Sequence, residues 1–224
     1  MPAASLFIIG AGRHGLEVGA YVGDLVRGGA ALRLVGYVDE RKPLGSPWGS
    51  GTVLGGLSEL RAHLDDHPSE RFHYITAVGD NRARRTLVEK LEQVESDRLT
   101  PLSIRHPFTV VGPHVKVGAG TCMAPGSVIT THVTIGQHVI VNVRVSISHD
   151  CVVGDYVNVN PGAVICGNVT LGEGSYVGAG AVVIEDITIG EWSIVGAGAS
   201  VVRDVPPRVT VAGVPARILK HHGT

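Results

Sequence analysis

His149 and Asp150 stand next to each other in the second half of the chain, and together they suggest acid–base chemistry. A neutral imidazole accepts a proton near neutral pH, and a carboxylate on its other nitrogen fixes the tautomer and stabilises the imidazolium. Such a base can take the proton from an amine or hydroxyl that attacks a carbonyl group, which contributes about 10²–10⁴ in rate. The resulting oxyanion needs a hydrogen-bond donor, and we expect the backbone N–H of Gly167, eighteen residues further on, to supply it.

A glycine-rich turn, GAGRHG at residues 10–15, follows an apolar run and precedes a helical pattern. In that context the glycines allow the backbone to approach a phosphate, and the N-terminus of the helix offers free N–H groups. We therefore expect Gly12, Arg13 and His14 to contact a nucleotide, with Arg13 adding positive charge for a diphosphate. A purely structural turn is the alternative, because GxGxxG alone is a weak signal.

Two further segments are expected to border the same nucleotide cleft. Asp39 and Glu40 end the second predicted strand, where an acidic side chain can accept a hydrogen bond from a ribose or a base. Gly79 lies in VGDN at residues 78–81, after the third predicted strand. This part of the chain has only about 100 residues. It therefore has room for one mononucleotide-binding half, and an NAD cofactor is a poorer fit.

The first hundred residues alternate predicted strands with predicted helices, which indicates a small parallel α/β sheet of the Rossmann-like type. The predicted strands are 5–10, 32–40 and 71–78, and the predicted helices are 14–27, 57–64 and 81–94. Pro101 and Pro107 interrupt the pattern within the segment 98–113, which we interpret as a joint. We therefore predict a nucleotide-binding domain at 1–105 and a second domain at 106–224.

A strict six-residue repeat runs through most of the second domain and ends before a C-terminal tail that follows Val205. Steps of six from Val111 to Val201 give sixteen positions, all aliphatic or Met, and the positions four residues after each are all small or β-branched. This period fits neither an α-helix nor a hairpin meander and predicts a parallel β-helix with three hexapeptides per coil. We expect the first set inside, the second set near the corners, and tight turns at the glycines that often follow the first set (Gly112, Gly118, Gly136, Gly154, Gly172, Gly178, Gly190, Gly196). A chance rhythm in a β-sandwich is the alternative, and sixteen consecutive matches disfavour it.

Composition argues against several other classes of protein. The formal net charge is −1 and no long basic stretch occurs, so nothing indicates a nucleic-acid partner. Three cysteines without CxxC spacing disfavour a disulfide framework or a zinc knuckle and favour a reducing cytoplasm. The first residues lack the basic start of a signal peptide, and no segment approaches the roughly 18 apolar residues of a membrane span. We expect a cytoplasmic protein without a membrane partner.

A column of polar residues is predicted at one edge of the β-helix, because His114, His132 and Asp150 are spaced by 18 residues. The column is either a solvated surface feature or part of an acceptor pocket. A γ-class carbonic anhydrase has the same kind of β-helix and binds zinc through three histidines. Its ligand steps of about 36 and 41 residues, taken from His114, reach Asp150 and Asp155, so we expect no metal.

The ordered set of these motifs resembles the bacterial left-handed β-helix acetyltransferases that act on UDP- or GDP-linked 4-amino-4,6-dideoxysugars. That family also includes the sialic acid O-acetyltransferases. The resemblance covers nearly the whole chain and rests on GAGRHG, Asp39-Glu40, VGDN, the unbroken hexapeptides, His149-Asp150 and AGVPAR at residues 212–217. The turn and the hexapeptides each occur in other proteins, whereas the full set in this order is specific.

The resemblance implies an N-acetyltransferase that uses acetyl-CoA as co-substrate and forms a homotrimer with active sites between neighbouring β-helices. It implies that His149 is the general base and that Asp150 raises its basicity. The implied nucleotide contacts are Gly12, Arg13, His14, Asp39, Glu40 and Gly79. The implied acetyl-CoA contacts are Asn158, Gly167, Ala179 and Ala197, with Val214 and Pro215 near the adenine end.

Asn158 departs from the family pattern, because some members carry a second histidine there that contacts the acyl donor. Asparagine can still form hydrogen bonds but does not titrate. Two other functions stay open from the sequence. One is O-acetylation of a sialic or other nonulosonic acid, and the other is a non-catalytic protein that binds nucleotide sugars.

Overall fold

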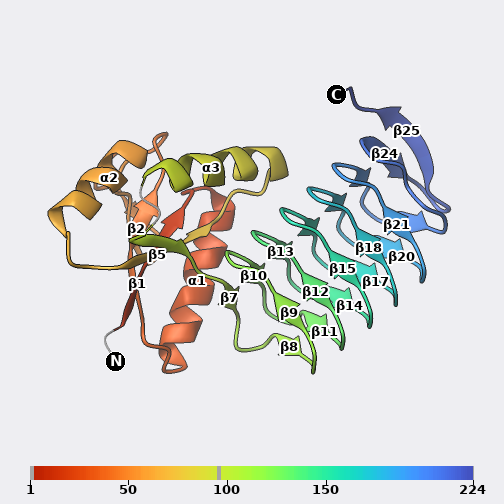
Figure 1. Ribbon diagram of the computed structural model, residues 1–224, viewed down its shortest axis with the longest axis horizontal. Coiled ribbons are helices and arrows are strands. Elements are labelled where there is room, and N and C mark those ends of the chain that lie inside the picture. Colours follow the sequence, from red (N-terminus) through yellow and green to blue (C-terminus); the bar gives the residue numbers. More distant parts are fainter. Residues whose placement is uncertain (1–2, 95–96, 224) are drawn as a thin grey trace. The chain divides into compact units, whose positions relative to one another are not determined.

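The computed structural model describes residues 3–94 and 97–223, which form two compact units with a division between residues 107 and 108. The first unit is built on a parallel sheet with the strand order β2–β1–β5–β6 (Figure 1). Its strands are β1 (Ala4–Ile9), β2 (Leu32–Val38), β5 (Phe72–Thr76) and β6 (Leu99–Pro101). The second unit is a parallel β-helix, so the predicted fold class is confirmed.

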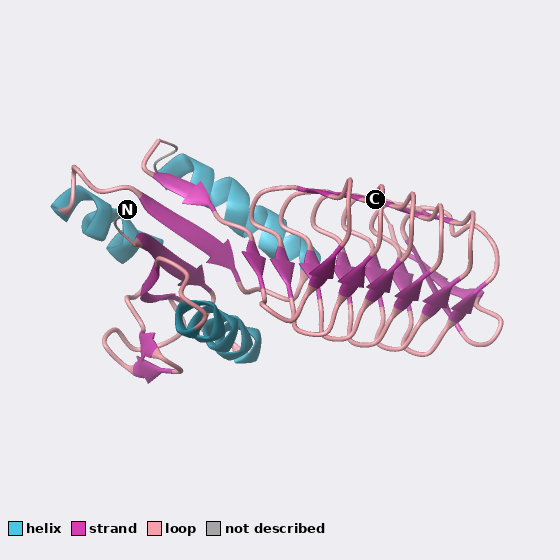
Figure 2. Ribbon diagram, turned by 90° about the horizontal axis from the view of Figure 1, so that it is seen from below, coloured by secondary structure: helices cyan, strands magenta, loops and turns pink. Residues whose placement is uncertain are grey.

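Helices cover both faces of this sheet. They are α1 (Arg13–Arg27), α2 (Leu57–Asp66) and α3 (Asn81–Val94). Figures 1 and 2 show α1 on one face and α2 with α3 on the other. On the second face, Leu60 and Leu64 of α2 and Leu91 of α3 share one apolar cluster with Phe7 and Phe72 of the sheet. This three-layer arrangement places the carboxyl ends of β1 and β2 beside the N-termini of α1 and α2, where such folds bind ligands.

The first unit also contains elements that the sequence did not indicate. Pro101, which was expected to break the pattern, is the last residue of β6 at the sheet edge, where its missing N–H deprives no partner strand of a bond. A short antiparallel pair, β3 (Pro47–Trp48) and β4 (Gly51–Thr52), follows β2, and β7 (Ile104–Arg105) follows β6. In the described part of the chain, no helix is both long and apolar enough to cross a membrane.

Two-residue strands recur every six residues through the second unit (Figures 1 and 2). They are β8 (Val110–Val111), β9 (Lys116–Val117), β10 (Cys122–Met123), β11 (Val128–Ile129), β12 (Thr134–Ile135), β13 (Ile140–Val141), β14 (Ser146–Ile147), β15 (Val152–Val153), β16 (Asn158–Val159), β17 (Val164–Ile165), β18 (Thr170–Leu171), β19 (Tyr176–Val177), β20 (Val182–Val183), β21 (Thr188–Ile189), β22 (Ile194–Val195) and β23 (Ser200–Val201). Each strand from β8 to β20 pairs in parallel with the strand one coil later, as β11 does with β14 through Val128 and Ser146.

These strands form three flat faces of a prism. The first face is β8–β11–β14–β17–β20–β23, the second is β9–β12–β15–β18–β21, and the third includes β10–β13–β16–β19–β22. We name the corners after the face they follow, so the first corner connects the first face to the second. The second residue of each strand points inward, and from Met123 to Val201 this set is buried, as predicted.

The glycines that follow the inward residues serve a different purpose from the one predicted. They do not have positive φ angles, so they are not the residues that make the turns. An added Cβ on Gly154 would lie 2.8 Å from the backbone nitrogen of Glu173, and one on Gly172 would lie 2.6 Å from that of Glu191. These glycines therefore allow neighbouring coils to stack closely. The left-handed turn position lies two residues later and often holds a polar residue, such as Asp150 with φ 60°.

After the hexapeptides end, two longer strands continue the third face. β24 (Val209–Ala212) pairs in parallel with β22, and β25 (Arg217–His221) pairs antiparallel with β24. Val214 and Pro215 lie in the connection between β24 and β25.

Candidate active site

His149 and Asp150 form a hydrogen-bonded pair on the first corner of the β-helix, directly after β14. Nδ1 of His149 donates to Oδ2 of Asp150 at 2.8 Å, so in the neutral ring the proton sits on Nδ1 and the Nε2 lone pair is free. The His149 side chain is 62% exposed, as expected for a residue that points outward. The left-handed backbone at Asp150 makes the turn that holds its carboxylate beside the ring.

Gly167 lies one coil further on, directly against the imidazole. A Cβ added to Gly167 would lie 2.5 Å from Cε1 and 2.7 Å from Nε2 of His149. The ring therefore occupies the space that any other residue at position 167 would fill. The N–H of Gly167 makes no hydrogen bond within the described residues, so it can donate to a ligand. The neighbouring N–H of Asn168 donates to the carbonyl of His149 at 2.9 Å and fixes the spacing of the two coils.

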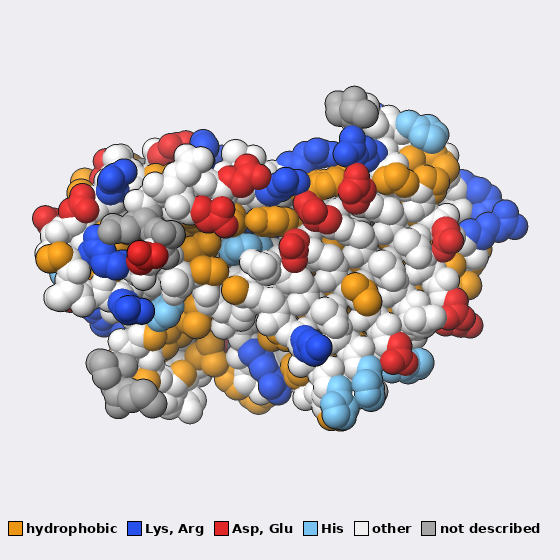
Figure 3. Space-filling view, in the orientation of Figure 1, with side chains coloured by type: hydrophobic (Ala, Val, Ile, Leu, Met, Phe, Trp, Pro, Cys, Tyr) orange, Lys and Arg blue, Asp and Glu red, His pale blue; other side chains and the backbone are white. Residues whose placement is uncertain are grey.

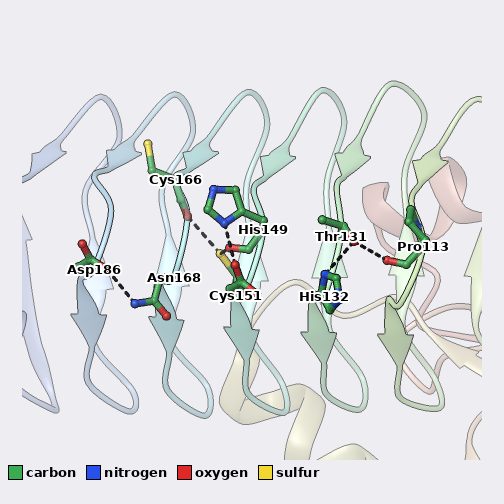
Figure 4. A network of polar contacts seen from close by, with 9 residues as sticks. Pro113, Thr131, His132, His149, Cys151, Cys166, Asn168 and Asp186 are labelled. Atoms are coloured by element: carbon green, nitrogen blue, oxygen red, sulfur yellow. Dashed lines mark hydrogen bonds and ion pairs between the residues drawn. The ribbon is translucent and has the colours of Figure 1, made fainter.

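The predicted polar column is present on the same corner. The rings of His114 and His132 are stacked with centroids 4.7 Å apart, and further along the amide of Asn168 donates to Asp186 at 2.7 Å (Figure 4). The space-filling view shows histidine side chains gathered at the surface of the β-helix (Figure 3). His149 is thus displayed on an edge lined with hydrogen-bonding side chains.

Two cysteines lie close to this corner. The Cys151 thiol is buried and donates to the carbonyl of Cys166 at 3.1 Å, and burial raises the pKa of this thiol. Cys151 is therefore a neutral core residue. Cys166 is half-buried and precedes Gly167 (Figure 4). Within the described residues, no group of three or more His, Cys, Asp or Glu side chains is arranged to hold a metal ion.

A cleft of about 300 Å³ in the first unit lies at the carboxyl ends of β1 and β2. It is lined by Ile9, Gly10, Val38, Asp39, Glu40, Arg41, Gly56, Leu57, Val78, Ala83, Leu87 and Lys90. Its size is at the lower end of the range for small-molecule sites. The predicted residues Asp39 and Glu40 line this cleft, and Gly79 directly follows the lining residue Val78.

Asp39 braces the glycine-rich turn. Its Oδ2 accepts the N–H of Ala11 at 2.9 Å, and its Oδ1 accepts the N–H of Arg41 at 3.0 Å. Burial opposes ionisation of Asp39, but the N–H donors of Ala11 and Arg41 outweigh it and lower the pKa of the carboxyl below its ordinary value. Asp39 is therefore a charged residue that fixes the turn. Glu40 is the other acidic residue of the lining, and its carboxylate makes no hydrogen bond or ion pair within the described residues.

The other predicted nucleotide contacts lie at the start of α1, outside the lining of the cleft. Gly12 is the N-cap residue of α1, and Arg13 is exposed. Nδ1 of His14 lies 3.0 Å from Oε2 of Glu17. These predicted contacts border a helix N-terminus, which offers free N–H groups to an anion.

Sequence reasoning missed the part of the cleft that comes from α3. Ala83, Leu87 and Lys90 all line it, and their spacing of four and three residues places them on one helix face. Arg84 was also missed: it is fully buried and donates to the carbonyl of Val78 at 2.8 Å. That bond fixes the loop after β5. The i, i+4, i+7 spacing on α3 was the available signal.

The predicted acetyl-CoA contacts lie on different parts of the prism. Ala179 and Ala197 occupy the third corner, because they follow β19 and β22. Asn158 belongs to β16 on the third face and is buried, whereas Val214 is exposed in the β24–β25 connection. A single chain therefore brings His149, Asp150 and Gly167 together but separates them from Ala179 and Ala197 by the width of the first face.

Comparison with known proteins supports an assignment for both units. The profile of the PglD N-terminal domain matches residues 5–91, and that of the bacterial transferase hexapeptide (six repeats) matches residues 168–203. No curated protein matches the chain significantly.

Solved structures similar to the whole chain include the acetyltransferase domain of PglB from Neisseria gonorrhoeae in complex with acetyl coenzyme A. It is 32% identical with a TM-score of 0.85, over 97% of this chain and 100% of that one. PerB from Caulobacter crescentus in complex with CoA and GDP-perosamine is 31% identical with a TM-score of 0.84, over 97% of this chain and 98% of that one. WeeI from Acinetobacter baumannii is 29% identical with a TM-score of 0.84, over 97% and 100% of the two chains.

Proposed function

This chain belongs to the bacterial family of left-handed β-helix nucleotide-sugar acetyltransferases and uses acetyl-CoA to acetylate an amino sugar; we propose that its acceptor is a UDP- or GDP-linked 4-amino-4,6-dideoxysugar and that His149 is the general base. The observation that carries the proposal is the exposed His149–Asp150 pair, whose imidazole lies on Gly167 with Nε2 free. The match to PerB, solved with GDP-perosamine, supports a nucleotide-linked amino sugar.

The proposed reaction uses one proton transfer in each direction. The neutral amine attacks the thioester carbon of acetyl-CoA, a C–N bond forms, and Nε2 of His149 takes a proton from the nitrogen. Asp150 stabilises the resulting imidazolium, and the N–H of Gly167 donates to the oxyanion. The C–S bond then breaks, and the sulfur leaves as the thiol with the proton returned by His149. The products are the acetamido sugar and CoA.

We also propose a homotrimer in which one copy supplies His149 and a neighbour supplies Ala179 and Ala197. These residues occupy different corners of one prism, so a neighbouring β-helix is needed to bring both sets to one acetyl group. The outward residues of the first face between these corners include Val128, Val164 and Val182, which are exposed in a single chain. An exposed apolar strip of this kind is suited to contact with another copy.

The test is release of CoA from acetyl-CoA with purified acceptors. We expect turnover with a UDP- or GDP-linked 4-amino sugar and none with the matched 4-hydroxy sugar. A free or CMP-linked sialic acid is presented in parallel. Turnover with sialic acid alone would make the protein an O-acetyltransferase and refute the proposed acceptor, and nucleotide binding without CoA release from any acceptor would indicate a non-catalytic binding protein.

A further inference from the structure

We propose that the cleft in the first unit selects guanine, so that the carrier of the amino sugar is GDP. This inference rests on the proposed function, because it concerns the base of the nucleotide that carries the acceptor. The cleft lies where the strands β1 and β2 end, beside the glycine-rich turn, and such positions take the nucleoside of a bound nucleotide.

The walls of the cleft are suited to a flat aromatic base. Apolar surface comes from three elements, with Leu57 at the start of α2, Ala83 and Leu87 on α3, and Val78 after β5. Apolar walls with a small number of polar groups fix the orientation of a ligand through those groups. The identity of the base is therefore decided by the polar side chains of the lining.

Two charged side chains of opposite sign, Glu40 and Lys90, are available to form hydrogen bonds with the base. Glu40 and Lys90 both line the cleft, and neither side chain forms a hydrogen bond or ion pair with any described residue. The Asp39 carboxylate already accepts the backbone N–H groups of Ala11 and Arg41, and the Arg41 side chain is paired with it, with Nε 3.6 Å from Oδ1.

Contacts of the backbone fix the position of Glu40 beside the N-terminus of α2. The N–H of Asp39 donates to the carbonyl of Gly55 at 2.7 Å, which pins the segment before Glu40. A Cβ added to Gly56 would lie 3.1 Å from Cβ of Glu40, so the root of the Glu40 side chain packs against the N-cap residue of α2. The backbone and Cβ of Glu40 are thus held in place, which limits the positions that its carboxylate can take.

A carboxylate and an ammonium match guanine better than uracil. Guanine presents two adjacent donors, N1–H and the N2 amino group, which pair with both oxygens of one carboxylate, and it presents O6 as an acceptor for an ammonium. Uracil offers a single donor, N3–H, between two carbonyl oxygens, so a carboxylate that pairs with N3–H meets a carbonyl oxygen. Glu40 therefore binds the guanine edge with both oxygens, and Lys90 binds O6.

The test is calorimetric binding of GDP and UDP to the full chain and to three variants. We expect GDP to bind at least about tenfold more tightly than UDP. Glu40→Gln should weaken GDP about 10–100-fold, as expected when hydrogen bonds to a charged group are lost, and change UDP less than threefold. Lys90→Met should weaken GDP selectively as well. Glu92→Gln, an exposed acidic residue of α3 outside the lining, is the control and should change neither.

The outcomes distinguish this inference from the proposed function. Equal affinity for GDP and UDP in the wild-type protein, or equal weakening of both by Glu40→Gln, overturns guanine selection, while CoA release with a UDP-linked amino sugar would still uphold the acetyl transfer. Absence of binding by either nucleotide overturns guanine selection, and absence of CoA release with every amino sugar overturns the function itself.

Discussion

Replacement of Gly167 by alanine tests most directly how the His149 ring is positioned on the first corner, because it adds one methyl group where that ring lies. The added Cβ would be 2.5 Å from Cε1 and 2.7 Å from Nε2, whereas an ordinary contact begins at 3.4 Å. The ring must therefore move by about 1 Å, and a misplacement of about 1 Å at a reacting group can cost about 100-fold in rate. We predict that Gly167→Ala lowers kcat about 100-fold.

The backbone itself should tolerate the change. Ala119, Ala179 and Ala197 occupy the equivalent position in other hexapeptides, and alanine keeps the N–H that is proposed to bind the oxyanion. The thermal midpoint should therefore stay close to that of the wild type. The expected loss comes from displacement of His149 alone.

The assay is kcat for CoA release at saturating substrates, combined with a double-mutant cycle. In a His149→Ala background, Gly167→Ala should have almost no further effect, because the ring that it displaces is absent. If Gly167→Ala keeps kcat within about threefold of the wild type, or if its effect persists fully in the His149→Ala background, the proposed packing of the ring on Gly167 is wrong.

Three further predictions concern stability. Burial lowers the pKa of His63 from its ordinary value of 6.5, so the folded state resists protonation of this side chain. The free energy of unfolding should therefore decrease as the pH drops below about 6.5. His63→Leu should reduce the accompanying decrease in Tm. Gly172→Ala should cost about 1–3 kcal/mol in urea unfolding, because its Cβ would lie 2.6 Å from the next coil, whereas Gly162→Asn, with φ +70° and open space, should cost little. Arg84→Met should cost about 2 kcal/mol or more and weaken nucleotide binding, because the Val78 carbonyl loses a buried donor. The first prediction is contradicted if His63→Leu and the wild type show the same dependence of Tm on pH. The second is contradicted if Gly172→Ala and Gly162→Asn lose equal free energy of unfolding. The third is contradicted if Arg84→Met keeps the stability and nucleotide affinity of the wild type.

The fold of the second unit was predictable because each inward side chain repeats at a fixed step. A burial pattern with that period leaves few alternative architectures, and it also predicted that His149 points outward and that Gly167 lies on the next coil. The turns were assigned to the wrong positions. Glycine has two uses, positive φ and close backbone approach, and the sequence alone does not separate them at Gly154 or Gly172.

The nucleotide cleft was only partly predictable. Asp39 and Glu40 were found because they end a strand, but their separate roles depend on hydrogen bonds to backbone groups that are distant in sequence. Lys90 and Arg84 come from α3, which packs on the sheet far from the glycine-rich turn in sequence. Local motifs do not report such tertiary neighbours, whereas the 30-residue separation of His149 and Ala179, which is not a multiple of 18, already places the two on different corners of the prism.

The most direct measurement of the central claim is kcat for acetylation of a nucleotide-linked 4-amino sugar by His149→Ala, with acetyl-CoA and nucleotide affinities measured on the same sample. The account predicts that kcat falls by about 10²–10⁴ while both dissociation constants change less than about threefold. A variant that keeps kcat close to the wild type would show that another group accepts the proton of the amine.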